Sequence, residues 1–252
     1  KYNIREYHHL KKLLKLMEAE PFILFGTDHI VAILAVILTA ILVPFCLKKT
    51  SVKTKHLVGS ILASVLILNE LLKPYYWSQF FDYDLLNVLP FHMCALSALS
   101  ISLFLITQKR ILYEVAFFWG IGGGLMALLQ PDTPLDFPNL IFIIFYLSHG
   151  AMLLAIGFAS ITLEKRPELD SMKRVILVSL VVIVVIYIIN IILGPPANYW
   201  YLGARPDGAS IMDLMPEPPR HIPIVVFLGL IMFSLIYLPY WIYDRIKSRD
   251  AG

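Results

Sequence analysis

The chain has 252 residues, of which 58% are hydrophobic and 15% charged, and its mean hydropathy is +0.74. Because about a quarter of the residues in a soluble domain are charged, this composition excludes an ordinary soluble protein and indicates an integral membrane protein. The formal net charge of +3 is what basic residues beside membrane segments produce, so it gives no reason to expect a nucleic-acid partner.

The first 22 residues have a basic amphipathic pattern. Leu10, Leu13, Leu14 and Met17 recur at helical spacing on one face, and lysines occupy other positions. This pattern predicts a short helix lying on the membrane surface. A solvated chain end is the alternative.

Seven apolar runs follow, each near the roughly 20 residues that a helix needs to cross the hydrocarbon core. They are Ile23–Leu47, His56–Lys73, Leu85–Thr107, Ile111–Gln130, Pro138–Leu163, Val175–Leu193 and Ile222–Tyr243. The sequence therefore predicts an all-α polytopic membrane protein with seven transmembrane helices. Its parts are an amphipathic N-terminal segment 1–22, a transmembrane domain 23–243 and a cytoplasmic tail 244–252.

The distribution of Lys and Arg predicts the orientation. Basic residues gather in the loops after the first, third and fifth runs and at the C-terminus, and they are sparse in the other loops. By the positive-inside rule, the C-terminus lies in the cytoplasm and the first apolar run begins outside. The basic N-terminal segment is the exception to this distribution.

On this topology, the polar side chains within the runs fall at similar depths in the outer half of the membrane. They are Asp28, His29, Asn69, Glu70, Lys73, His92, Cys94, His149 and Asn190. A polar side chain at membrane depth is costly unless it faces a partner or a water-filled cavity. We therefore expect these side chains to line one shared polar site open toward the outer leaflet. Taken singly, each has a structural alternative, as an interfacial ion pair or a packed and satisfied group.

Three of these residues carry potential chemistry. His92 and Cys94 are two positions apart, so on one helix they point in directions about 200° apart. A histidine that assists Cys94 must then come from another helix, and His149 is the candidate. An imidazole can take the proton of a thiol, which suits acyl transfer through a thioester. The expected roles are His149 as general base, His92 orienting groups or stabilising an oxyanion, and Cys94 as a possible nucleophile or a packed thiol.

Two outer loops are expected to cover this site. The loop 130–138 contains Asp132, which either covers the mouth of the site or is solvated. The loop after the sixth run holds seven of the sixteen prolines, an aromatic stretch and Arg205, which predicts an ordered cap able to meet anionic lipid head groups. The expected substrate-binding residues are Asn69, Glu70, Lys73, Asp132, Asn190 and Arg205.

Five motifs carry a family resemblance. In chain order they are "FILFGTDHI", "LPFHMC", "FWGIGGGLMALLQPD", "YLSHG" and "NYWYLGARPDGASIMDLM". They resemble the bacterial YwaF-like seven-helix integral membrane proteins over about residues 21–243. That family is similar to the animal transmembrane acyltransferases that remodel ether phospholipids, and more distantly to the androgen-induced fatty-acid-ester hydrolases. The resemblance implies a bacterial plasma membrane protein with a helix-borne nucleophile and, at His149, the histidine of a later helix.

Three functions are compatible with these observations. The first is an intramembrane acyltransferase or lipid-ester hydrolase acting on phospholipid acyl chains, with a phospholipid or fatty-acyl substrate as its partner. The second is a binder or transporter of a small amphiphile without covalent chemistry, and the third is a structural membrane subunit. No cofactor is expected. His29, His92, His149 and Glu70 are suitable metal ligands by type, but no local spacing supports a metal site.

Overall fold

The computed structural model describes residues 20–81, 84–205 and 211–250. The predicted amphipathic segment 1–22 therefore lies almost wholly outside the described residues. The α-helices are α2 (Thr27–Leu47), α3 (Val52–Phe81), α4 (Leu85–Val88), α5 (Met93–Thr107), α6 (Arg110–Leu129), α7 (Leu140–Gly157), α8 (Leu169–Leu193) and α9 (Ile222–Asp250). A π-helical turn, η1 (Phe158–Thr162), extends α7, and the 3-10 turns η2 (Tyr199–Tyr201) and η3 (Ile211–Leu214) lie in the α8–α9 loop. The predicted all-α class is confirmed.

Six helices in the described part of the chain are long and apolar enough to cross a membrane, namely α2, α3, α6, α7 with η1, α8 and α9. The surface of the bundle is covered by large exposed hydrophobic side chains, which in water would be strongly unfavourable. The protein is therefore a polytopic membrane protein. The remaining apolar helix, α5, has 15 residues, fewer than the roughly 20 that span a bilayer.

The prediction of one continuous helix over Leu85–Thr107 is wrong, because the chain leaves the helical conformation between α4 and α5. Leu89 is extended, with φ −62° and ψ 151°, and His92 is extended at the N-cap of α5. Pro90 explains the break, since proline has no N–H to donate and disfavours a helical conformation in the residue before it. A non-helical segment, Leu89–His92, thus lies between two helices.

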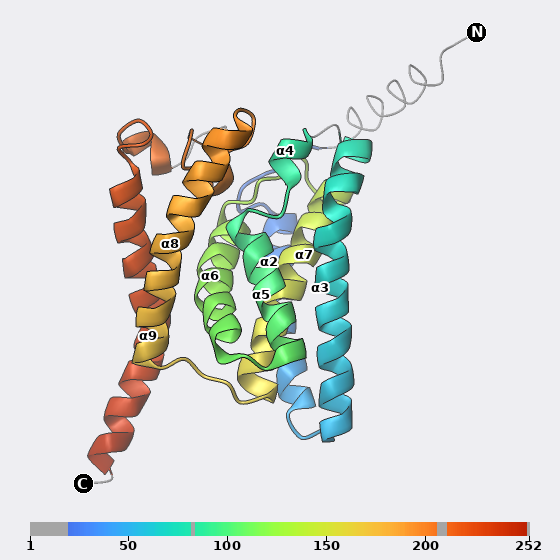
Figure 1. The fold of residues 1–252 in the computed structure, drawn as a ribbon. Helices are drawn as coiled ribbons and strands as arrows, with labels where there is room; N and C mark the ends of the chain where they lie inside the picture. The colour runs from blue at the N-terminus through green and yellow to red at the C-terminus, as the bar shows by residue number, and fades with distance from the viewer. Residues whose placement is uncertain (1–19, 82–83, 206–210, 251–252) are drawn as a thin grey trace.

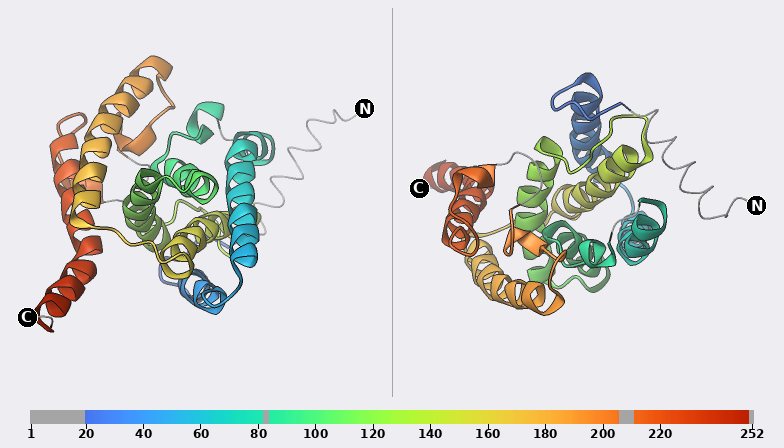
Figure 2. Two further views of the ribbon diagram at one scale, coloured as in Figure 1. Left: turned by 60° about the horizontal axis from the view of Figure 1, so that its bottom comes forward. Right: turned by 90° about the horizontal axis from the view of Figure 1, so that it is seen from above.

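The helices form a bundle with α5 and α6 at its centre. Seen from above, α2, α3 and α7 lie on one side of this central pair, and α8 and α9 lie on the other (Figure 2, right). Helix α6 contacts α5, α7, α8 and α9, and 61% of its most apolar stretch is buried, against 11% for α2 and for α9. Consecutive helices run in alternating directions, with α5 returning the chain between α3 and α6 (Figure 1).

Glycine permits a close backbone contact between α2 and α7. A Cβ added at Gly157 would lie 2.2 Å from the carbonyl oxygen of Ala40. Backbone atoms cannot move aside as a side chain can, so any larger residue would push these two helices apart. The pair forms one wall of the bundle.

The two ends of the bundle differ in character. One end carries the α8–α9 loop, and we call it the cap end (top in Figure 1). The other, the basic end, carries the α2–α3, α5–α6 and α7–α8 connections and the last turns of α9. There Glu114 is fully buried and accepts hydrogen bonds from Arg110 Nε at 2.9 Å, Ser171 Oγ at 2.7 Å and Arg174 Nε at 2.9 Å. This network joins α6 to α8.

Candidate functional site at the cap end

The break between α4 and α5 lies under the loop that follows α8, and side chains of that loop satisfy one backbone carbonyl in α4 and one in the break. The hydroxyl of Tyr199 donates to the carbonyl of Leu86, and Trp200 Nε1 donates to that of Phe91 at 3.0 Å. A phenol is protonated at neutral pH, and burial raises the pKa of Tyr199 further, so its hydroxyl is able to donate. Non-helical backbone at membrane depth requires such partners. The described part of the loop is therefore an ordered cap tied to the site.

His92 is the last residue of the break and is held from two sides. Its Nε2 lies 2.8 Å from the carbonyl oxygen of Asn87, and its ring packs edge-on against Tyr199, with 4.9 Å between centroids. A carbonyl only accepts hydrogen bonds, so Nε2 carries the proton and the neutral ring presents Nδ1 as an acceptor. His92 in this state orients a donor and does not itself donate to an oxyanion.

Cys94 lies in the first turn of α5 and faces α6. A Cβ added at Gly123 would lie 3.6 Å from its Sγ, so the absence of a side chain at Gly123 leaves room for the thiol between the two helices. Cys94 is half-buried, and its thiol is free. The prediction that His92 and Cys94 point in different directions stays a prediction. Their surroundings differ, because His92 packs against the cap and Cys94 lies beside α6.

His149 lies in the middle of α7 and is half-buried. Its Nδ1 donates to the carbonyl oxygen of Phe145 at 2.8 Å, and the two rings are 4.3 Å apart. The proton on Nδ1 leaves Nε2 of the neutral ring as an acceptor or base. Among the described residues, Nε2 makes no hydrogen bond, and neither does Cys94. The two groups are therefore not paired with each other in this state.

Glu70 is the most deeply buried acidic group of the candidate site, with 6% of its surface exposed. Its Oε1 accepts a hydrogen bond from Asn69 Nδ2 at 3.2 Å, and Asn69 Oδ1 in turn accepts one from Tyr76 at 3.1 Å. The second carboxylate oxygen, Oε2, is buried and has no hydrogen-bond partner in the described residues. A buried carboxylate oxygen without a partner is costly, so a ligand group or water is expected there.

Lys73 lies one turn after Glu70 on α3, and its charge is near enough to act at long range on His92, Cys94 and His149. Helices α3, α5 and α7 contact one another pairwise. We call the polar side chains that these helices carry toward the cap end the polar cluster. Its members are Asn69, Glu70, Lys73, His92, Cys94 and His149.

The three other predicted substrate-binding residues lie in or beside loops. Asn190 is buried and holds the backbone of Tyr199, donating to its carbonyl and accepting from its N–H, both at 2.9 Å. Arg205 donates to the carbonyl of Met215 and pairs with Glu217 at 3.1 Å. These two side chains organise the cap. Asp132 is exposed in the α6–α7 loop, and its role as a ligand contact stays a prediction.

Sequence reasoning missed several residues that shape this end. Tyr76 extends the hydrogen bonds of Asn69, and Asp136 accepts from the backbone N–H groups of Ile23 and Phe137. His29 was grouped with the polar residues, but both of its nitrogens are occupied, by Phe25 N–H at 2.8 Å and the Leu128 carbonyl at 2.7 Å. The position of Asp136 just before an apolar run could have marked it as a polar group at a helix end. The sequence could not show which backbone groups it binds.

A small apolar cluster lies on the cap side of the polar cluster. Trp77, Val88 and Ile141 pack together from α3, α4 and α7. Trp77 is one helical turn beyond Lys73, and Ile141 is about two turns before His149. In the described ranges, no group of three or more His, Cys, Asp or Glu side chains is placed to hold a metal ion. A base, a thiol, a cation and an unpartnered carboxylate oxygen are thus carried by three helices that contact one another.

Comparison with known proteins agrees with the motif resemblance. Residues 24–237 match the profile of the TMEM164 family. An uncharacterised protein of Treponema pallidum (strain Nichols) is 27% identical over 201 residues, which cover 76% of this chain and 79% of that protein. No solved structure matches the chain.

Proposed function

Because the chain belongs to the TMEM164 family of membrane proteins, we propose that it is an intramembrane lipid-active enzyme. The proposed activity is transfer of a fatty-acyl chain from a phospholipid, or hydrolysis of the ester that holds it. One observation carries the proposal. The helices that carry Lys73, Cys94 and His149 contact one another pairwise, and the charge of Lys73 acts at long range on His92, Cys94 and His149, which supports a shared site for base, thiol and cation.

The free nitrogen of His149 and the thiol of Cys94 support a two-step acyl transfer. In the first step, Nε2 of His149 takes the thiol proton, and the sulfur attacks the ester carbonyl of a phospholipid. The ester C–O bond then breaks, and the leaving lysophospholipid oxygen takes the proton from His149. In the second step, His149 deprotonates an acceptor hydroxyl or a water, which attacks the thioester, and the thiol is restored as the C–S bond breaks.

Lys73 is the proposed stabiliser of the oxyanion that forms in each step. Its ammonium group is the cationic donor of the cluster, whereas a neutral His92 presents only an acceptor. His92 instead orients the acceptor hydroxyl. If Cys94 is only a packed thiol, His149 activates the acceptor directly, and Lys73 keeps the same role.

We also propose that the chain crosses the membrane seven times, with α4 and α5 together completing the third pass. The alternating helix directions support this count (Figure 1). The proposed orientation puts the basic end in the cytoplasm of a bacterial cell and the polar cluster in the outer half of the plasma membrane. Lys48, Lys109, Arg166 and Arg245 at the basic end support it.

The test uses purified protein reconstituted with acyl-labelled phospholipids and lysophospholipid acceptors, followed by mass spectrometry of the lipid products. We expect acyl transfer or fatty-acid release that His149→Ala abolishes and His56→Ala, at the exposed start of α3, preserves. Cys94→Ala should remove a hydroxylamine-sensitive acyl adduct if the thioester forms, with Cys46→Ala as its matched control. Identical products from the wild type and His149→Ala over a broad donor panel would refute the enzyme proposal.

A second candidate function is binding or transport of a small amphiphile without covalent chemistry. The unpartnered Oε2 of Glu70 favours it, since a ligand hydroxyl or ammonium group satisfies a carboxylate without reacting. This function predicts that Glu70→Gln weakens binding of an amphiphile while the lipid products of wild type and variants stay the same. Loss of acyl transfer in His149→Ala would exclude it as the sole function.

A further inference from the structure

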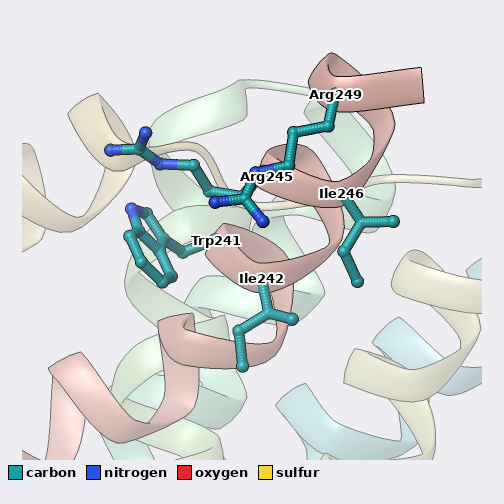
Figure 3. A pocket seen from close by; sticks show the side chains of 5 residues that line it. All are labelled: Trp241, Ile242, Arg245, Ile246 and Arg249. Carbon is teal, nitrogen blue, oxygen red and sulfur yellow. The ribbon is translucent and has the colours of Figure 1, made fainter. Parts of the chain in front are cut away.

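A second polar site lies at the opposite end of the bundle, in the last turns of α9. An open surface pocket of about 300 Å³ is lined by Trp241, Ile242, Arg245, Ile246 and Arg249, all on α9. Trp241, Arg245 and Arg249 are four residues apart along the helix, so their side chains form one stripe, and they gather on one side of α9 (Figure 3). We call these five residues the α9 pocket.

The charge of the α9 pocket is not neutralised by the protein that the structure describes. The guanidinium of Arg245 lies over the ring of Trp241, 5.2 Å from its centroid, and neither Arg245 nor Arg249 pairs with a described carboxylate. Asp244 is the adjacent acidic residue, but it pairs with Arg166 at 2.7 Å. A cation–π contact leaves guanidinium N–H groups free to donate.

The rest of the α9 pocket is apolar and faces outward. Trp241, Ile242 and Ile246 are 45%, 44% and 56% exposed, and they lie at the end of a helix long and apolar enough to span a membrane. A water-soluble anion would gain nothing from these side chains. A lipid would place its acyl chains along Ile242 and the apolar turns of α9 before it, and its charged group at the arginines.

We propose that the α9 pocket binds the head group of an anionic phospholipid. Arg245 and Arg249 donate hydrogen bonds to the phosphate, a geometry that guanidinium groups match in a bidentate manner. Trp241 lies at the level of the head groups, where tryptophan is enriched, and orients Arg245. This site is separate from the polar cluster, and it does not depend on the proposed acyl transfer.

The experiment measures lipid binding to the full chain in a neutral detergent by native mass spectrometry. Phosphatidylglycerol and phosphatidylcholine with the same acyl chains are compared, together with glycerol 3-phosphate as a soluble anion. The variants are Arg245→Gln and Arg249→Gln, and the matched control is Lys247→Gln, which removes the same charge from a position off the stripe. Phosphatidylglycerol should bind more tightly than phosphatidylcholine. Each arginine substitution should weaken it about fivefold, equivalent to about 1 kcal/mol, and the control less than about twofold.

Three results would overturn the proposal. Equal weakening by Lys247→Gln would show that net charge, and not the α9 pocket, attracts the lipid. Binding of glycerol 3-phosphate as tight as that of phosphatidylglycerol would show a simple anion site. A lipid-independent dimer that the arginine substitutions disrupt would show that a second copy of the chain occupies this surface. Circular dichroism of each variant checks that the helices remain intact.

Discussion

Two buried glutamates at opposite ends of the same bundle differ in how completely their carboxylate oxygens are hydrogen-bonded. At the basic end, Glu114 is fully buried and receives hydrogen bonds from Arg110, Ser171 and Arg174. At the cap end, Glu70 is 6% exposed and has one oxygen without a partner among the described residues. The carboxylate of Glu114 stabilises the fold, since it joins α6 to α8. The carboxylate of Glu70 keeps an oxygen without a partner among the described residues, which is what a ligand-binding role would require.

The largest expected effect is on stability at the basic end. Glu114→Gln replaces an acceptor oxygen by an amide donor facing the arginines, whose side chains are 53% and 46% exposed. Water therefore screens part of the loss, and we expect a cost of about 2–3 kcal/mol from the charged hydrogen bonds. Thermal unfolding in detergent should show a clear fall in the midpoint. Glu168→Gln, whose side chain is 57% exposed, is the control and should lose less than about 1 kcal/mol. Equal losses in the two variants would contradict the structural role of Glu114.

A substitution in the cap can show whether the buried polar groups at the cap end also stabilise the fold. Asn190→Leu leaves the buried N–H and C=O of Tyr199 without partners, which costs about 2 kcal/mol. We expect a lower unfolding midpoint and faster proteolysis within residues 194–205. Asn198→Leu removes contacts to the backbone of Gly203 and Ala204 that are open to water, so its effect should be smaller. Unchanged proteolysis in Asn190→Leu would show that Asn190 does not hold the cap.

Glu70→Gln is expected to separate stability from function. The side chain keeps its shape and its bond from Asn69, so the free energy of unfolding should change by less than about 0.5 kcal/mol. Acyl transfer or amphiphile binding should fall roughly tenfold or more, because a charged hydrogen bond to the ligand is lost. Both quantities are measured on one preparation, with the exposed Glu164→Gln as control. A large loss of stability with normal activity would show that Glu70, like Glu114, stabilises the fold and does not bind a ligand.

The smallest effect is expected from an exposed ion pair near Glu114. Lys173 and Asp170 are 2.9 Å apart, with side chains 64% and 68% exposed. Lys173→Ala should change the free energy of unfolding by about 0.5 kcal/mol at most. If it destabilised the protein as much as Glu114→Gln, the basic end would depend on total charge and not on the convergence of donors on one buried carboxylate.

The sequence predicted the membrane helices well because hydropathy is a local property, summed along each run. The same averaging concealed the break at Leu89–His92, even though Pro90 was visible within the run. Pairing across the bundle is not local. Glu114 and Arg174 are 60 residues apart, and their spacing alone carries no sign of their contact.

In the candidate site, too, local properties could be predicted from the sequence and contacts between helices could not. Depth along the helices was the basis for grouping Glu70, His92, Cys94 and His149, because rise per residue fixes depth, and the shared site itself stays a prediction. Rotation about each helix axis decides which groups face one another, and packing fixes it. The hydrogen bonds that set the tautomers of His92 and His149 also depend on the fold. The sequence could not distinguish Asn190, which holds the cap, from a ligand contact.

The shortness of α5 has a consequence for the surrounding bilayer. Its 15 residues cover about 22 Å, whereas the hydrocarbon core is about 30 Å thick. Unless the bilayer thins locally, a third pass made by α4 and α5 would place the non-helical Leu89–His92 segment and the polar groups beside it inside the hydrocarbon core, deeper than the lipid ester bonds at its boundary. The depth of the site then depends on hydrophobic mismatch. Longer acyl chains in the bilayer would bury the segment more deeply, and shorter ones would bring it to the interface.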